Sequence, residues 1–73
     1  MLRVMIVDDS GIDAHRRSLY LRLMLEQVGY VVVAEIFEPR KIYAAVKTHA
    51  PDVIIVDTES PSRDTLEHVA VLS

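Results

Sequence analysis

The stretch from Pro51 to Pro61, which reads PDVIIVDTESP, constrains the fold more than any other part of the sequence. Val53–Val56 is an unbroken run of branched apolar residues that leads directly into Asp57. A short β-branched run between turn signals predicts a strand covered on both faces, as in a parallel sheet. Asp57 is then expected at the carboxyl end of that strand, where open α/β sheets bind their ligands.

Length and composition predict one small domain with an excess of apolar surface. The chain has 73 residues, of which 51% are hydrophobic, and it has no cysteine. Because a chain this short covers little of its apolar surface, we expect that it binds a partner or belongs to a longer chain. The lack of cysteine excludes disulfides and thiolate metal sites. A formal net charge of −3 argues against a nucleic-acid surface on these residues. Because neither a signal peptide nor a membrane span is predicted, we expect a cytoplasmic protein with no membrane contact.

Further apolar runs and helical patterns alternate along the chain. The predicted strands are Arg3–Val7, Tyr30–Phe37 and Val53–Val56, and the predicted helices are Gly11–Val28, Arg40–Ala50 and one that starts at Pro61. We expect Ser10 to cap the first helix at its start and Gly29 to end it in a left-handed conformation. The third helical pattern stops at Ser73 without a stop signal, which predicts that residues 1–73 are the N-terminal part of a single domain.

Helical spacing predicts which side chains face the core. In the first helix, Ile12, Leu19 and Leu23 share one face, with Leu21 and Leu25 pointing away from it. In the second helix, the predicted buried residues are Ile42, Ala45 and Val46.

Strands that alternate with helices predict a parallel sheet with right-handed crossovers, for which two main strand orders are possible. We predict the flavodoxin-like order 2-1-3, in which the first strand lies in the middle and the two helices cover opposite faces. The switch point then falls between strands one and three, and the ends of Val7 and Val56 lie side by side. Asp8, Asp9 and Asp57 are therefore expected to converge.

Three converging carboxylates repel one another, and a hard divalent cation relieves that repulsion. Magnesium takes oxygen ligands, commonly one or two carboxylates together with phosphate oxygens. An aspartate beside such an ion can attack a phosphoryl group and form an acyl phosphate. We predict that Asp57 is the attacking group and that Asp8 and Asp9 hold magnesium. The structural alternative is that each aspartate only caps a turn or a helix.

Other candidates are weaker. His15, His49 and His68 share no metal-ligand spacing, and the chain has no glycine-rich phosphate loop.

The motifs VMIVDD and DVIIVD, with Pro61 four residues after Asp57, resemble the receiver domain of bacterial response regulators over the whole chain. The stretch DTESPSRDTLEHV looks like the receiver half of NasT/AmiR-like antiterminators, which carry an RNA-binding ANTAR domain behind it. The resemblance implies that Asp57 accepts phosphate from a sensor histidine kinase, or that a sensor protein controls the module. It also implies that Asp8, Asp9 and Asp57 bind Mg²⁺ together with the backbone carbonyl of Glu59.

Two departures from the receiver pattern stand out. Glu59 is bulky and acidic beside the phosphoryl site, where it can alter access of water. The Ser or Thr and the Lys that receivers place after later strands lie beyond Ser73. Without those strands, we expect Val53–Val56 to form an exposed edge through which the 73 residues dimerise or swap elements.

The leading hypothesis is therefore a two-component signalling module and not an enzyme, with RNA bound through a missing C-terminal output domain for transcription antitermination. The first alternative is an interaction module that a partner sensor protein controls without phosphorylation. The second is an aspartyl-phosphate phosphohydrolase, but enzymes of that kind place a second aspartate where this chain has Glu59.

Overall fold

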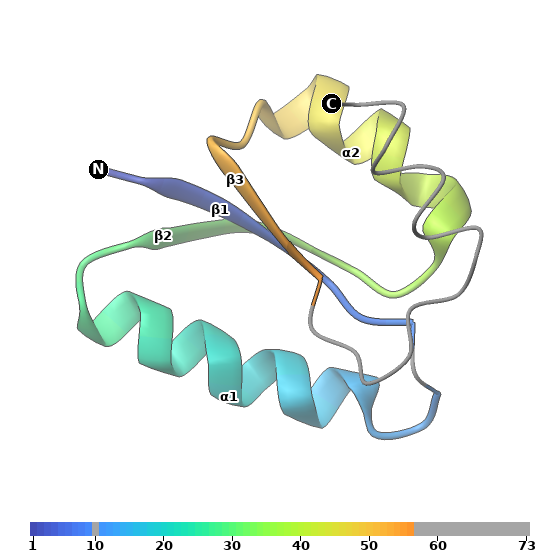
Figure 1. Cartoon of the computed structure of the whole chain (residues 1–73), viewed down its shortest axis with the longest axis horizontal. Coiled ribbons are helices and arrows are strands. Elements are labelled where there is room, and N and C mark those ends of the chain that lie inside the picture. Colours follow the sequence, from blue (N-terminus) through green and yellow to red (C-terminus); the bar gives the residue numbers. More distant parts are fainter. Residues whose placement is uncertain (10, 57–73) are drawn as a thin grey trace.

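The computed structural model describes residues 1–9 and 11–56, which form a small parallel sheet with a helix on each face (Figure 1). The elements follow one another as β1 (Arg3–Val7), α1 (Ala14–Gln27), β2 (Val31–Ile36), the 3₁₀ turn η1 (Pro39–Lys41), α2 (Ile42–His49) and β3 (Val53–Val56). The predicted strands β1 and β3 are confirmed at both ends, and β2 is one residue shorter at each end than predicted. The predicted helix from Pro61 lies outside the described residues.

The sheet has the order β2-β1-β3, with both pairings parallel. Of the two strand orders that the alternating pattern allowed, the structure has the flavodoxin-like one, and that prediction is confirmed. Val7 pairs with Ile36 on one side and with Val56 on the other, so the three strands end at the same edge. The β1–β2 ladder shifts register between Val4 and Met5.

The core surrounds β1 because that strand has a neighbour on each side and a helix over each face. Its residues Val4 to Val7 are at most 1% exposed. On the α2 side, Met5 and Val7 pack with Ile42 and Ala45. Partly buried apolar residues complete this cluster: Ala34, Ile36, Val46, Ile54 and Val56. The predicted buried face of the second helix is therefore confirmed.

Strand β3 is less covered than its sequence predicts. Within the described residues, Val53 is exposed and the other three positions are only partly buried. In the described residues the run is therefore less covered than a strand buried on both faces, and it lies at the outside of the sheet, as the predicted order 2-1-3 requires. An apolar run predicts a buried strand but does not say which strand is central.

Helix α1 begins at Ala14, three residues later than predicted. Gly11 has a φ of +93°, and the Ala14 amide donates to the Gly11 carbonyl at 3.1 Å, so a turn precedes the helix. Asp13 holds the N-cap position without a side-chain cap, and Ser10, the predicted cap, lies outside the described residues. The predicted left-handed end at Gly29 is confirmed, with a φ of +95°.

The predicted core face of α1 is wrong. Ile12, Leu19 and Leu23 are 96%, 44% and 47% exposed. The face toward the sheet carries Ala14 and Ser18, which are buried, followed by partly buried Leu21, Arg22 and Leu25. These five positions recur at helical spacing, so the helix turns toward the sheet a mixed face that includes Ser18 and Arg22, and not the predicted apolar one.

The reason for that rotation lies in β2, where Glu35 points at α1. Ser18 Oγ donates to Glu35 Oε2 at 2.7 Å, and Arg22 Nη1 donates to Glu35 Oε1 at 2.8 Å. A largely buried carboxylate needs such donors, and only the polar side of α1 supplies them.

Within the described residues, no helix is both long and apolar enough to cross a membrane.

Candidate functional site

Asp8 is the first residue after β1, at the edge where the three strands end. Its backbone amide donates to the Ile36 carbonyl at 2.9 Å, which continues the ladder with β2 by one residue. Its side chain is completely buried at the end of the central strand, which has a neighbouring strand on each side. The sequence-predicted site residue is therefore where the fold class requires it.

Arg17 of α1 holds the Asp8 carboxylate with both arms of its guanidinium. Nε donates to Oδ2 at 2.8 Å and Nη2 donates to Oδ1 at 3.1 Å. A buried carboxylate is costly unless it is paired, and a two-point contact with arginine is among the strongest pairings available. The Arg17 side chain itself remains 39% exposed. Asp8 is thus a completely buried negative charge whose positive partner is partly exposed.

Sequence reasoning missed Arg17. Its position was nevertheless unusual, since it lies in the first turn of α1, where the helix dipole disfavours cations. A basic residue there, close after an acidic pair at a strand end, is the signal that would have found it. The turn of backbone that brings it into reach runs from Asp13, whose carbonyl accepts the Arg17 amide at 3.0 Å.

The remaining predicted site residues are only in part placed. Asp9 is partly buried next to Asp8. Asp57 and Glu59 lie outside the described residues, although Val56, which directly precedes Asp57, pairs with Val7. In residues 1–9 and 11–56, no group of three or more acidic, histidine or cysteine side chains is close enough to hold a metal ion. The magnesium site thus stays a prediction that depends on Asp57.

The residues that are placed fit a hard divalent cation in their chemistry. Asp8 and Asp9 offer carboxylate oxygens, which magnesium prefers. Asp8 is also buried deeply enough to need a positive partner, and Arg17 supplies one. Asp8 and Asp9 therefore supply two of the carboxylates that a magnesium site with Asp57 would need.

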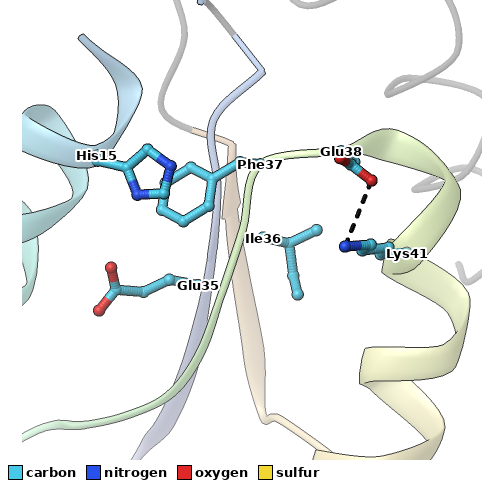
Figure 2. A pocket seen from close by; sticks show the side chains of 6 residues that line it. All are labelled: His15, Glu35, Ile36, Phe37, Glu38 and Lys41. Carbon is cyan, nitrogen blue, oxygen red and sulfur yellow. Dashed lines mark ion pairs between the residues drawn. The ribbon is translucent and has the colours of Figure 1, made fainter. Parts of the chain in front are cut away.

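A second feature is a hollow of about 240 Å³ beside the carboxyl end of β2 (Figure 2). It is lined by His15, Glu35, Ile36, Phe37, Glu38 and Lys41. The His15 ring stacks on the Phe37 ring with centroids 3.8 Å apart, and Lys41 Nζ lies 3.4 Å from Glu38 Oε2. Arg40, through a hydrogen bond, and then Lys41 hold the pKa of Glu38 below its ordinary value of 4.5. These contacts pair the Glu38 carboxylate at the rim with two cations.

Comparison with known proteins supports a receiver domain of a response regulator as the class of this chain. The protein is similar to the protein-glutamate methylesterase/protein-glutamine glutaminase 1 of Paramagnetospirillum magneticum, with 35% identity over 65 residues. That match covers 89% of this chain and 16% of the relative. It is also similar to the protein-glutamate methylesterase/protein-glutamine glutaminase of Paraburkholderia xenovorans, with 34% identity over 71 residues. This second match covers 97% of this chain and 19% of that relative. No protein-family model and no solved structure matches the chain significantly.

The comparisons correct one expectation and leave another without support. The prediction that the protein is not an enzyme is wrong, because both relatives are named as enzymes. The chain spans less than a fifth of the length of these relatives, and the similarity lies in their receiver part. Neither relative supports the predicted ANTAR type.

Proposed function

We propose that this chain is the receiver module of a response regulator, in which Asp57 accepts a phosphoryl group from a sensor histidine kinase. In this proposal the Asp57 carboxylate attacks phosphorus, the kinase histidine leaves, and an acyl phosphate forms. Asp8 and Asp9 hold Mg²⁺ with Asp57 and the backbone carbonyl of Glu59. The bound ion would neutralise charge on the transferred oxygens.

The observation that carries the proposal is the completely buried Asp8 at the end of the central strand. Its carboxylate lies at the sheet edge toward which β3 also runs, since Val7 pairs with Val56. A phosphoacceptor that follows Val56 would therefore stand beside Asp8.

The test is phosphorylation with a small phosphodonor in the presence of magnesium, followed by intact-mass measurement. We expect one phosphoryl adduct that requires Mg²⁺ and disappears in Asp57→Asn. Asp13→Asn is the matched control, because Asp13 is exposed at the start of α1 and is no part of the proposed site. An adduct that persists in Asp57→Asn, or none in the parent protein that contains this chain, would refute the proposal.

The output of the module is the second part of the proposal. Both curated relatives are protein-glutamate methylesterases/protein-glutamine glutaminases, which favours an attached enzyme that hydrolyses side-chain esters or amides on a protein. The antiterminator-like stretch after Asp57 favours instead an RNA-binding ANTAR domain. Release of methanol from methyl-esterified protein by the parent protein would support the first output. RNA binding without esterase activity would support the second.

Two further proposals concern partners. If a sensor protein controls the module without phosphorylation, Asp57→Ala leaves partner binding intact. If Asp57 is the phosphoacceptor, partner binding should change in Asp57→Ala. Among the described strands β3 pairs only with β1, and Val53 is 38% exposed, which supports self-association of the 73 residues through this strand. Sedimentation that shows a monomer at every concentration would contradict that association.

A further inference from the structure

We propose that Arg17 is a built-in counter-ion that competes with Mg²⁺ for Asp8, so that metal binding requires the guanidinium to release at least one Asp8 oxygen. The inference rests on the proposed function, because it concerns the same crevice. It adds a residue that sets the metal affinity from within α1. It also links the first turn of that helix to the metal.

The contact geometry is the first support. Arg17 donates to both Asp8 oxygens, at 2.8 and 3.1 Å, so neither oxygen lacks a cationic partner. Magnesium requires close, nearly octahedral oxygen contacts and tolerates distortion poorly. A guanidinium on both oxygens also repels a dication that approaches them, and this repulsion is strong in a buried site. Both cations therefore cannot hold Asp8 in the same way at once.

The second support is the unequal freedom of the two partners. Asp8 is completely buried, and its amide is tied to the Ile36 carbonyl. Arg17 ends a long side chain that is 39% exposed, so water can solvate its guanidinium after release. Its place in the first turn of α1 adds repulsion from the helix dipole, with no acidic residue in that turn to offset it. When the pair opens, Arg17 is the side chain that moves.

The competing interpretation is that Arg17 positions Asp8 for the metal, as outer residues often do for metal ligands. The two interpretations predict opposite signs. If Arg17 competes, its removal tightens magnesium binding. If Arg17 positions the carboxylate, its removal weakens magnesium binding.

The experiment is calorimetric titration of the purified protein with MgCl₂ alone. We expect Arg17→Gln to lower the magnesium Kd about tenfold, since a hydrogen-bonded charged pair no longer has to open. Arg17→Lys keeps the positive charge but loses the two-point contact of the guanidinium. Its magnesium Kd should lie between the values for Arg17→Gln and the wild type. Arg16→Gln is the matched control, because it removes one exposed α1 cation directly beside Arg17 in the chain, and we expect a change below about twofold.

Loss of Arg17 leaves a buried carboxylate without this partner, so Arg17→Gln will be less stable without metal. Thermal unfolding with and without MgCl₂ uses this effect as a second readout, because the variant should gain more stability from magnesium than the wild type does. If Arg17→Gln does not fold without metal, Arg17→Lys decides the question.

Equal or weaker magnesium binding in Arg17→Gln and Arg17→Lys overturns the inference, as does the absence of magnesium binding in every variant. Binding in the variants but not in the wild type supports it. The phosphorylation test fails or succeeds separately. A protein that binds magnesium more tightly without Arg17 but never phosphorylates Asp57 would refute the proposed function and keep the inference.

Discussion

Replacement of Glu35 by alanine tests whether a polar network holds α1 on the sheet. Glu35 accepts from Ser18, whose side chain is completely buried, and from Arg22, which is 42% exposed. Without Glu35, the buried Ser18 hydroxyl loses its acceptor, at a cost of about 1–3 kcal/mol. The Arg22 guanidinium is then solvated by water, and the lost ion pair with Glu35 lowers the free energy of unfolding by only about 0–1 kcal/mol. We therefore expect Glu35→Ala to lower the free energy of unfolding by about 2 kcal/mol.

Urea unfolding measures this loss, and a double-mutant cycle assigns it. Ser18→Ala and Glu35→Ala should be coupled by about 1 kcal/mol, because they remove the same hydrogen bond. Glu35→Gln keeps an acceptor for Ser18 and should lose about half as much as Glu35→Ala. Glu26→Ala is the control, since its pair with Arg22 spans 3.7 Å at the exposed helix surface and is worth less than about 0.5 kcal/mol.

The reasoning is refuted if Glu35→Ala costs less than about 0.5 kcal/mol or if the effects of Ser18→Ala and Glu35→Ala simply add. Apolar contacts would then hold α1 in place. The result also bears on the site. Ser18 directly follows Arg17, so the same hydrogen bond fixes the part of α1 from which Arg17 reaches Asp8.

Three further predictions concern single positions. Ile42→Ala should lower the free energy of unfolding by about 3 kcal/mol in denaturant unfolding, because the side chain is completely buried against β1; a loss below about 1 kcal/mol would contradict the core assignment. Gly29→Ala should cost about 1–2 kcal/mol through its φ of +95° alone, since nothing lies within 4 Å of an added Cβ; an unchanged melting temperature would contradict this. The pKa of Glu38 is lowered by Arg40 and Lys41, so its ionised form stabilises the fold above about pH 4.5, and this gain is lost as the pH falls through the lower folded value. The melting temperature of Glu38→Gln should therefore lie slightly below that of the wild type at neutral pH and meet it in acid; a difference that grows in acid would contradict the assignment.

Local patterns predicted the framework of this fold correctly. The strands β1 and β3, the end of α1 at Gly29 and the buried face of α2 each follow from a few neighbouring residues. Alternating strands and helices with right-handed crossovers left two strand orders possible, and the structure has the predicted flavodoxin-like one. These features depend on short sequence segments or on general rules of chain geometry.

The face of α1 was predicted wrongly because its cause lies elsewhere in the chain. Leucine spacing favoured Leu19 and Leu23, whereas Glu35 in β2 draws Ser18 and Arg22 inward. The spacing of apolar residues describes one helix only. It carries no information about Glu35, which lies on a strand later in the chain. A buried polar partner therefore overrode a wide apolar stripe.

The candidate site was predicted in part for the same reasons. Asp8 and Asp9 were found because they follow an apolar run that predicts a buried strand. Arg17 was not found, because a pair formed across nine residues and a turn has no periodic pattern. The role of Asp57 stays a prediction, since the described residues end at Val56.

The hydrogen bond from the Asp8 amide to the Ile36 carbonyl has a consequence for how the site can move. It adds the Asp8 amide to the end of the ladder between β1 and β2, at a residue that is completely buried and therefore shielded from solvent. We therefore expect the Asp8 amide to be among the slowest to exchange, at a rate close to that of global unfolding. The acid at the centre of the crevice would then share the stability of the entire fold. Any adjustment of the crevice to a bound ion must accordingly come from side chains and from the surrounding turns, while the Asp8 backbone remains fixed.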